Sequence, residues 1–231
     1  MLPHDDLKGH TMTRIDLYRN VHMGQRARLF ALATQLGAAD VGAVPELADR
    51  CLAMTQELRE HADHEDSFIH GLLRERAPLA ADALEGEHVR LDAAFIALDE
   101  RARALPGTEA ESRPEAQHAL YLALNEVISA YLAHLYAEET VAMPALWQSA
   151  GDEELTAVLV AFRASRTPEE ALTDLRRMLP ALPPGPRAAI VRGIVETAGE
   201  QANSTLASVC ATLSSDQRDR LYEDLGVSEA R

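Results

Sequence analysis

The chain has 231 residues, of which 47% are hydrophobic, 26% are charged and 4% are aromatic, and its formal net charge is −15. This composition supports a sizeable core and excludes global disorder, and the negative charge excludes nucleic acid and anionic membranes as favourable partners. Ala and Leu are abundant while aromatic residues are scarce, so we expect an all-α fold. No apolar run reaches membrane-spanning length and the first residues lack a signal-peptide pattern, so we expect a cytoplasmic protein.

Four long helical segments are expected first along the chain, over about residues 13–36, 45–76, 79–105 and 114–147. Pro45 and Pro114 suit first helical turns, Pro78 and Pro106 separate neighbouring segments, and Pro144 bends or ends the fourth. Long helices joined by short connections are typical of an up-down-up-down four-helix bundle. We therefore expect such a bundle over residues 12–150.

Residues 151–231 are expected to form a smaller helical C-terminal extension. Thr167 with Glu170 predicts a capped helix start, and Ser214 predicts another. No residue pattern in this part suggests chemistry, so its expected roles are to cover the bundle, to form a homodimer or to contact a partner. Cys51 and Cys210 lie in apolar helical stretches without a nearby second cysteine, which predicts two buried free thiols.

Two of the long segments carry the same His-x-x-x-Glu unit. His61 and Glu65 are four residues apart, as are His134 and Glu138. Residues four apart share one face of a helix, and both pairs fall within an apolar stripe. Each pair is therefore expected to point into the bundle.

The other two long segments also send polar groups inward. His22 lies in the apolar stripe of the first segment, and His88 lies in that of the third, with Asp92 four residues after it on the same face. Unpaired polar groups in a core cost several kcal/mol each, so these inward groups are expected to satisfy one another or to bind metal. Imidazoles and carboxylates from four facing helices build two-metal sites. This donor set suits iron, manganese or zinc, and the lack of thiolates excludes iron–sulfur and structural zinc sites.

The remaining histidines are interpreted from their positions on a continuous helix. His64 lies on the flank of the stripe of His61, where it either supports a ligand or faces solvent. His70 points opposite to His61 and is expected in solvent, together with Asp63 and Asp66. No role is assigned to His4, His10 or His118.

The order His, His-x-x-x-Glu, His, His-x-x-x-Glu on four successive helices resembles the hemerythrin-like (HHE cation-binding) domain. The local matches are YRNVHMGQR around His22, HADHEDSFI around His61, EGEHVRLDAAF around His88 and AHLYAEETVAMPAL around His134. The resemblance covers about residues 12–150, and the extension is similar to those of some bacterial members.

This resemblance implies two iron ions in a non-haem di-iron centre, oxo- or hydroxo-bridged, with manganese or zinc as less favoured metals. The ligands that it implies are His22 and His61 on one iron, His88 and His134 on the other, and Glu65 and Glu138 as bridges.

Two features depart from oxygen-carrying hemerythrins, which have His-x-x-x-His on the third helix and an Asp, spaced one residue further on, on the fourth. Here Asp92 follows His88, and the fourth helix uses Glu138. If Asp92 binds iron, the added anion favours the ferric state and oxygen or peroxide reduction. If it does not, one iron has an open position. Tyr18 and Tyr131 either hydrogen-bond a bound ligand or pack.

The resemblance implies an oxidoreductase, oxidase-like or peroxidase- and catalase-like, that reacts with dioxygen, peroxide or nitric oxide, with or without an organic substrate. The alternative is a non-catalytic protein that binds or senses oxygen, nitric oxide or iron, whose extension relays the state of the site. A third hypothesis, a metal-free interaction module, leaves the inward polar groups unexplained. Measured turnover would distinguish the oxidoreductase from the binding or sensing protein. Metal content would distinguish both of these from the metal-free module.

Overall fold

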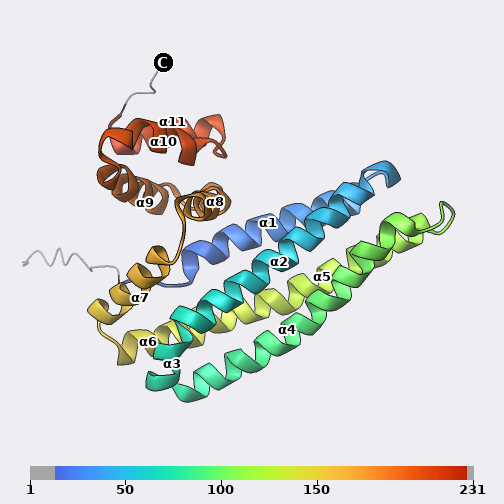
Figure 1. Ribbon diagram of the computed structural model, residues 1–231, viewed down its shortest axis with the longest axis horizontal. Helices are drawn as coiled ribbons and strands as arrows, with labels where there is room; N and C mark the ends of the chain where they lie inside the picture. The colour runs from blue at the N-terminus through green and yellow to red at the C-terminus, as the bar shows by residue number, and fades with distance from the viewer. Residues whose placement is uncertain (1–13, 228–231) are drawn as a thin grey trace, which may run out of the picture.

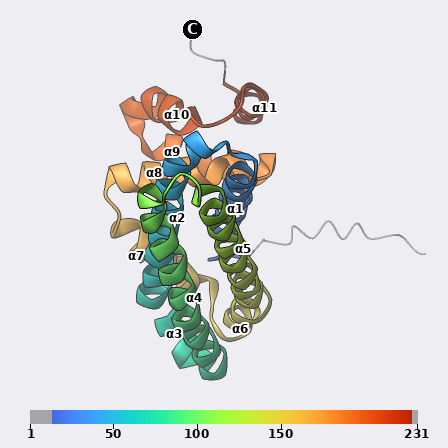
Figure 2. The same cartoon turned by 90° about the vertical axis from the view of Figure 1, so that its right-hand side faces the viewer.

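The structure is a computed structural model that describes residues 14–227. Every element in this part of the chain is a helix or helical turn, which confirms the expected all-α class. The four long helices are α1 (Arg19–Ala38), α2 (Val44–Phe68), α4 (Pro78–Ala104) and α5 (Arg113–Ala137). They lie side by side and run alternately in opposite directions, with α3 and α6 together at one end (Figures 1 and 2). Residues 12 and 13 of the predicted bundle, and His4 and His10, lie outside the described residues.

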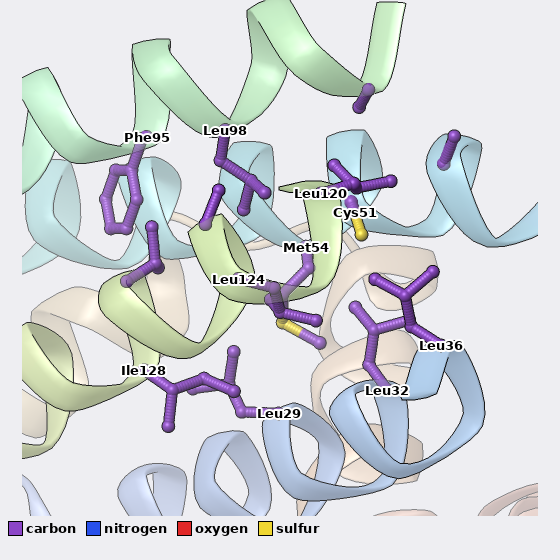
Figure 3. Close-up of a cluster of buried hydrophobic side chains, with 14 of the residues drawn as sticks. Leu29, Leu32, Leu36, Cys51, Met54, Phe95, Leu98, Leu120, Leu124 and Ile128 are labelled. Carbon is purple, nitrogen blue, oxygen red and sulfur yellow. The ribbon is translucent and has the colours of Figure 1, made fainter. Parts of the chain in front are cut away.

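The four long helices share one hydrophobic core, because each carries apolar residues at helical spacing. Figure 3 shows α1, α2, α4 and α5 all directing side chains into it. The labelled core residues are Leu29, Leu32, Leu36, Cys51, Met54, Phe95, Leu98, Leu120, Leu124 and Ile128. A fully buried Leu or Phe contributes about 1.5–3 kcal/mol relative to an exposed one. This core therefore fixes the spacing of the four helices and the polar groups that lie further along them.

Two of the four segments predicted as continuous helices are interrupted. The second breaks at Ile69, and the chain resumes as α3 (His70–Arg76). The fourth passes into a π-helical stretch, η3 (Glu138–Ala142), and continues as α6 (Met143–Ser149), with Pro144 in the first turn. Pro144 therefore does not end the helical segment, which continues to Ser149, and a bend at Pro144 stays a prediction. A proline is accommodated there because it fits a first helical turn. The break at Ile69 was not predicted.

Short connections carry 3₁₀ turns. These are η1 (Val41–Ala43), η2 (Leu105–Gly107), η4 (Leu179–Ala181) and η5 (Gly199–Gln201).

Five helices follow in the described C-terminal part, of which α7 and α8 pack against the first part of the chain and the other three pack on one another and on α8. They are α7 (Asp152–Ala164), α8 (Pro168–Met178), α9 (Pro184–Thr197), α10 (Ala202–Cys210) and α11 (Ser215–Leu225). The helix α7 lies against α2, and α8 lies across α1 (Figure 1). At the second crossing the backbones come close, since a Cβ added to Gly24 would lie 2.9 Å from the carbonyl oxygen of Arg177.

The predicted local features of this part are present. Thr167 accepts a hydrogen bond from the backbone N–H of Glu170, and Ser214 caps α11 in the same way. Cys51 and Cys210 are buried free thiols, and burial raises the pKa of Cys51 to about 12, so this thiol is inert at neutral pH. Within the described residues, no helix combines the length and the apolar character that crossing a membrane requires.

Candidate metal centre

Six of the seven predicted ligands come together where α1, α2, α4 and α5 face one another. His22 lies on α1, His61 and Glu65 on α2, His88 on α4, His134 on α5, and Glu138 is the first residue of η3. His22 and Glu138 are 0% exposed, and Glu65 is 1% exposed. Placing two carboxyl groups and several imidazoles in a core is costly unless they have partners.

Glu65 spans the centre. Its Oε1 lies 2.9 Å from His61 Nε2 and 3.7 Å from His22 Nε2. Its Oε2 lies 3.6 Å from His88 Nε2. The two oxygens of one carboxyl group therefore face two different sets of histidines.

Glu138 repeats this arrangement from the opposite side. Its Oε2 lies 3.3 Å from His22 Nε2, and its Oε1 lies 3.2 Å from His134 Nε2. The Nε2 atoms of His88 and His134 are 3.0 Å apart. Two carboxylates that each face two histidine sets have the geometry of bridging ligands between two metal ions.

The donor atoms fall into two overlapping groups whose potential ligand atoms lie within 4.8 Å of one another. One group contains His22, His61 and Glu65. The other contains Glu65, His88, His134 and Glu138. Glu65 belongs to both groups, as expected of a residue between two ions.

The key polar atoms of this site have no hydrogen-bond partner within the described residues. They are His22 Nε2, His61 Nε2 and both carboxylate oxygens of Glu65 and of Glu138. A buried unsatisfied polar atom costs about 1–3 kcal/mol, and more when charged. Nitrogen and carboxylate donors that converge without partners fit divalent or trivalent iron, manganese or zinc.

The far side of two candidate ligands is held by a carboxylate. His22 Nδ1 lies 2.9 Å from Glu139 Oε1, which also accepts a hydrogen bond from Arg26 at 2.6 Å. His134 Nδ1 lies 2.9 Å from Glu87 Oε2. A carboxylate that accepts from Nδ1–H leaves Nε2 as the lone-pair donor, which is the tautomer that binds metal.

The electrostatics of the metal-free site favour protonated histidines next to charged carboxylates. Burial alone would lower the pKa of His22, but its hydrogen bond to Glu139 and the nearby Glu65 carboxylate raise it to about 9. His134 behaves in the same way, and Glu138 raises its pKa to about 9 against the effect of burial. Burial would raise the pKa of Glu65, but the neighbouring histidines hold it well below its usual range. A metal ion that bound to these atoms would therefore have to displace protons.

Asp92 does not join this group, although the sequence predicted it as a ligand. Its side chain is 55% exposed, and its Oδ1 accepts a hydrogen bond from Arg59 Nε at 2.9 Å. A four-residue step turns a helix by about 40° beyond a full turn. The same step keeps Glu65 beside His61 inside the site, so the spacing alone does not decide the outcome; Asp92 lies at the exposed edge of α4, where Arg59 of α2 pairs with it outside the site.

The prediction that His70 faces solvent is wrong. Its side chain is 0% exposed; it lies directly after the break at Ile69, with its ring stacked on that of His88. His70 Nδ1 lies 2.7 Å from Asp66 Oδ1. Asp66 is exposed as expected, but it pairs with this buried histidine.

His64 lies away from the ligand cluster. Its Nε2 is 3.1 Å from Arg166, and its ring packs edge-on against Phe162 of α7. Burial and the nearby Arg166 lower its pKa. The contacts of His64 therefore attach α7 to α2.

The two tyrosines expected near the site, Tyr18 and Tyr131, differ in the hydrogen bonding of their hydroxyl groups. Tyr131 is buried and donates a hydrogen bond to Gln25 Oε1 at 3.0 Å, so its hydroxyl is satisfied by packing neighbours. Tyr18 is also buried, with its ring 5.6 Å from that of His22, and its hydroxyl has no hydrogen-bond partner among residues 14–227. Burial, and then the charges of Glu65 and Glu138, raise the pKa of Tyr18 well above its usual range, which keeps it protonated as a donor.

Three contributors were missed from sequence. Glu139 and Glu87 are each adjacent in sequence to a predicted ligand, Glu138 and His88. That adjacency to a ligand was the available signal, because a residue next to one ligand can reach the back of another. The contribution of His70 depends on the break at Ile69, for which the sequence offered no proline.

Comparisons of the chain with protein-family models, with curated proteins and with solved structures found no match. The function is therefore argued from the site itself.

Proposed function

We propose that the chain is a non-haem di-iron protein similar to the hemerythrin-like domain, with its four long helices forming an up-down-up-down bundle around two iron ions. The observation that carries this proposal is the pair of buried carboxylates, Glu65 and Glu138, whose unpartnered oxygens face different histidines. Facing helices that supply histidines and shared carboxylates are the usual construction of two-metal sites in helical proteins.

In this proposal each ion would be held by two histidines and by the carboxylates of Glu65 and Glu138. The ligands are His22 and His61 for one ion, His88 and His134 for the other, and Glu65 and Glu138 between them. Bound iron supplies one-electron chemistry toward dioxygen, peroxide or nitric oxide. Manganese and zinc fit the same donors, and the resemblance to the hemerythrin-like domain favours iron.

The chain itself orients the donors and excludes water. Glu139 and Glu87 hold the Nδ1 protons of His22 and His134, which fixes the ring orientation of both ligands. The Tyr18 hydroxyl is buried and has no hydrogen-bond partner in the described part of the chain, and the Tyr18 ring lies beside that of His22, so this hydroxyl would be the candidate donor to a small ligand. His61 and His88 each keep 12% of their side chain exposed, so access suits small ligands.

The test for an oxidoreductase uses the full chain loaded with ferrous iron without air. Dioxygen, hydrogen peroxide or nitric oxide is then added, with a reductant in one arm, while absorption and ligand consumption are followed. Consumption many times greater than the bound iron supports an enzyme. Stoichiometric and reversible spectral change supports a binding protein. No iron binding, or no response to any of the three ligands, contradicts the proposal.

One observation favours the alternative of a binding or sensing protein. The extension contacts α1 at Gly24, two residues after His22, where the backbones leave no room for a side chain. A change in the position of His22 would therefore shift the backbone of α8. A homodimer through the C-terminal helices stays a prediction.

A further inference from the structure

His70 has the features of a metal ligand that the hemerythrin-like pattern does not assign. Its side chain is completely buried, and its Nε2 has no hydrogen-bond partner within the described residues. An unpaired buried nitrogen costs about 1–3 kcal/mol, so a fold that places one there without use is unfavourable.

The other nitrogen of His70 is held as in the candidate ligands. His70 Nδ1 lies 2.7 Å from Asp66 Oδ1, just as His22 Nδ1 lies 2.9 Å from a Glu139 oxygen. Asp66 is 47% exposed, so its charge is solvated and it accepts from Nδ1–H at little cost. The tautomer that results leaves the lone pair on Nε2, the free atom.

His70 also lies against the proposed centre. Its ring stacks on that of His88, with centroids 5.4 Å apart and planes 16° from parallel. Asp66 Oδ1 lies 3.6 Å from His88 Nδ1, so one carboxylate serves both rings. Potential ligand atoms of Asp66, His70 and His88 lie within 4.8 Å of one another, and His88 also belongs to the group with Glu65, His134 and Glu138.

We propose that His70 is a fifth histidine ligand, on the ion held by His88 and His134. This inference rests on the proposed di-metal centre. His70, His88 and His134 would then hold that ion together with Glu65 and Glu138, whereas His22 and His61 would hold the other ion with the same two carboxylates.

The same inference explains why Asp92 is dispensable. The sequence offered Asp92 as the extra ligand on this ion, but Asp92 pairs with Arg59 at the surface. His70 supplies the extra donor from α3, after the break at Ile69. The added ligand is thus neutral rather than anionic, which favours the ferric state less than a carboxylate does.

The test uses the full-length metal-free protein, titrated with cobalt(II) as the probe. His70→Phe keeps a buried aromatic ring against His88 and removes both nitrogens. The matched control is His64→Phe, which alters a histidine on α2 that also packs against an aromatic ring but lies outside the cluster. Affinities for both ions are measured by competition, and proton NMR counts the paramagnetically shifted exchangeable imidazole signals.

We expect two cobalt ions per chain in the wild type and in His64→Phe. In His70→Phe one ion should bind at least about tenfold more weakly, because losing a ligand costs no less than losing a supporting residue. It should also show one shifted N–H signal fewer. A merely structural role would not change that count.

Unchanged affinities and an unchanged signal count in His70→Phe would overturn the inference while leaving the di-metal centre intact. Failure of the wild type to bind cobalt would instead remove both proposals. Circular dichroism of the metal-free variants checks folding. If His70→Phe does not fold, His70→Gln, which retains polarity, is expected to show the same loss of one signal.

Discussion

Replacing Glu65 by Gln tests the bridging geometry most sharply. Glu65 faces His22 and His61 through Oε1 and His88 through Oε2, at 2.9–3.7 Å. Glu65→Gln keeps the shape but leaves one oxygen and a neutral NH₂ group, which cannot bind metal. One ion thus loses an anionic ligand, and the N–H groups of the amide face that ion instead.

The expected loss exceeds that for residues that only support a ligand, which cost about 10–100-fold in metal affinity. We therefore expect at least about a 100-fold weaker second ion, equivalent to about 2.8 kcal/mol. The assay is iron and cobalt stoichiometry and affinity by equilibrium competition, with thermal unfolding of the metal-free and loaded forms.

Glu57→Gln is the matched control. Glu57 lies two turns earlier on α2, is 11% exposed, and pairs with Arg28 and Arg177 outside the site. The Glu57→Gln variant should retain both ions. Two tightly bound ions in Glu65→Gln would refute the bridging role, and equal losses in both variants would show that the effect is general destabilisation.

Three further predictions follow from the same contacts. The metal-free protein should lose stability as the pH rises from about 6.5 to 9. The pKa of His22 and of His134 is raised to about 9 in the folded protein. Each raised pKa stabilises the fold by on the order of 3 kcal/mol, and this stabilisation is complete below the unfolded pKa of about 6.5 and lost above pH 9. A thermal-unfolding midpoint that does not change over this pH range would contradict the assignment. Asp92→Asn should retain both ions and cost less than about 1 kcal/mol, since it breaks only an exposed pair with Arg59; loss of an ion by metal analysis would place Asp92 in the site. Gly24→Ala should destabilise the chain by about 1–3 kcal/mol in denaturant unfolding, because its Cβ would lie 2.9 Å from the backbone of α8. An unchanged denaturant midpoint would show that α8 shifts away from the new Cβ at no cost in stability.

Much of the candidate site could be predicted because its determinants are local. The four-residue spacing of His61 with Glu65, and of His134 with Glu138, fixes a shared helix face whatever the tertiary structure. The apolar stripes around these pairs then decide that the shared face is buried. For the same reason the helix starts at Thr167 and Ser214 were predictable, since a cap acts within one turn.

The features of the site that could not be predicted depend on contacts between distant parts of the chain. Asp92 has a suitable spacing from His88, but only the packing of α2 against α4 brings Arg59 to it. His70 was misplaced because periodicity assumes an unbroken helix, and the break at Ile69 has no proline to mark it. Glu139 reaches His22 across the 117 positions that separate them in sequence.

The most direct measurement is the metal content of the purified full-length protein after anaerobic reconstitution with ferrous iron and removal of excess metal. Two converging donor sets that share Glu65, with Glu138 in contact with His22 and His134, predict two irons per chain. Glu57→Gln, treated in parallel, should hold the same number. A folded, helical protein that retains no metal would contradict the di-iron centre and leave a helical interaction module whose buried histidines and carboxylates pair only with one another.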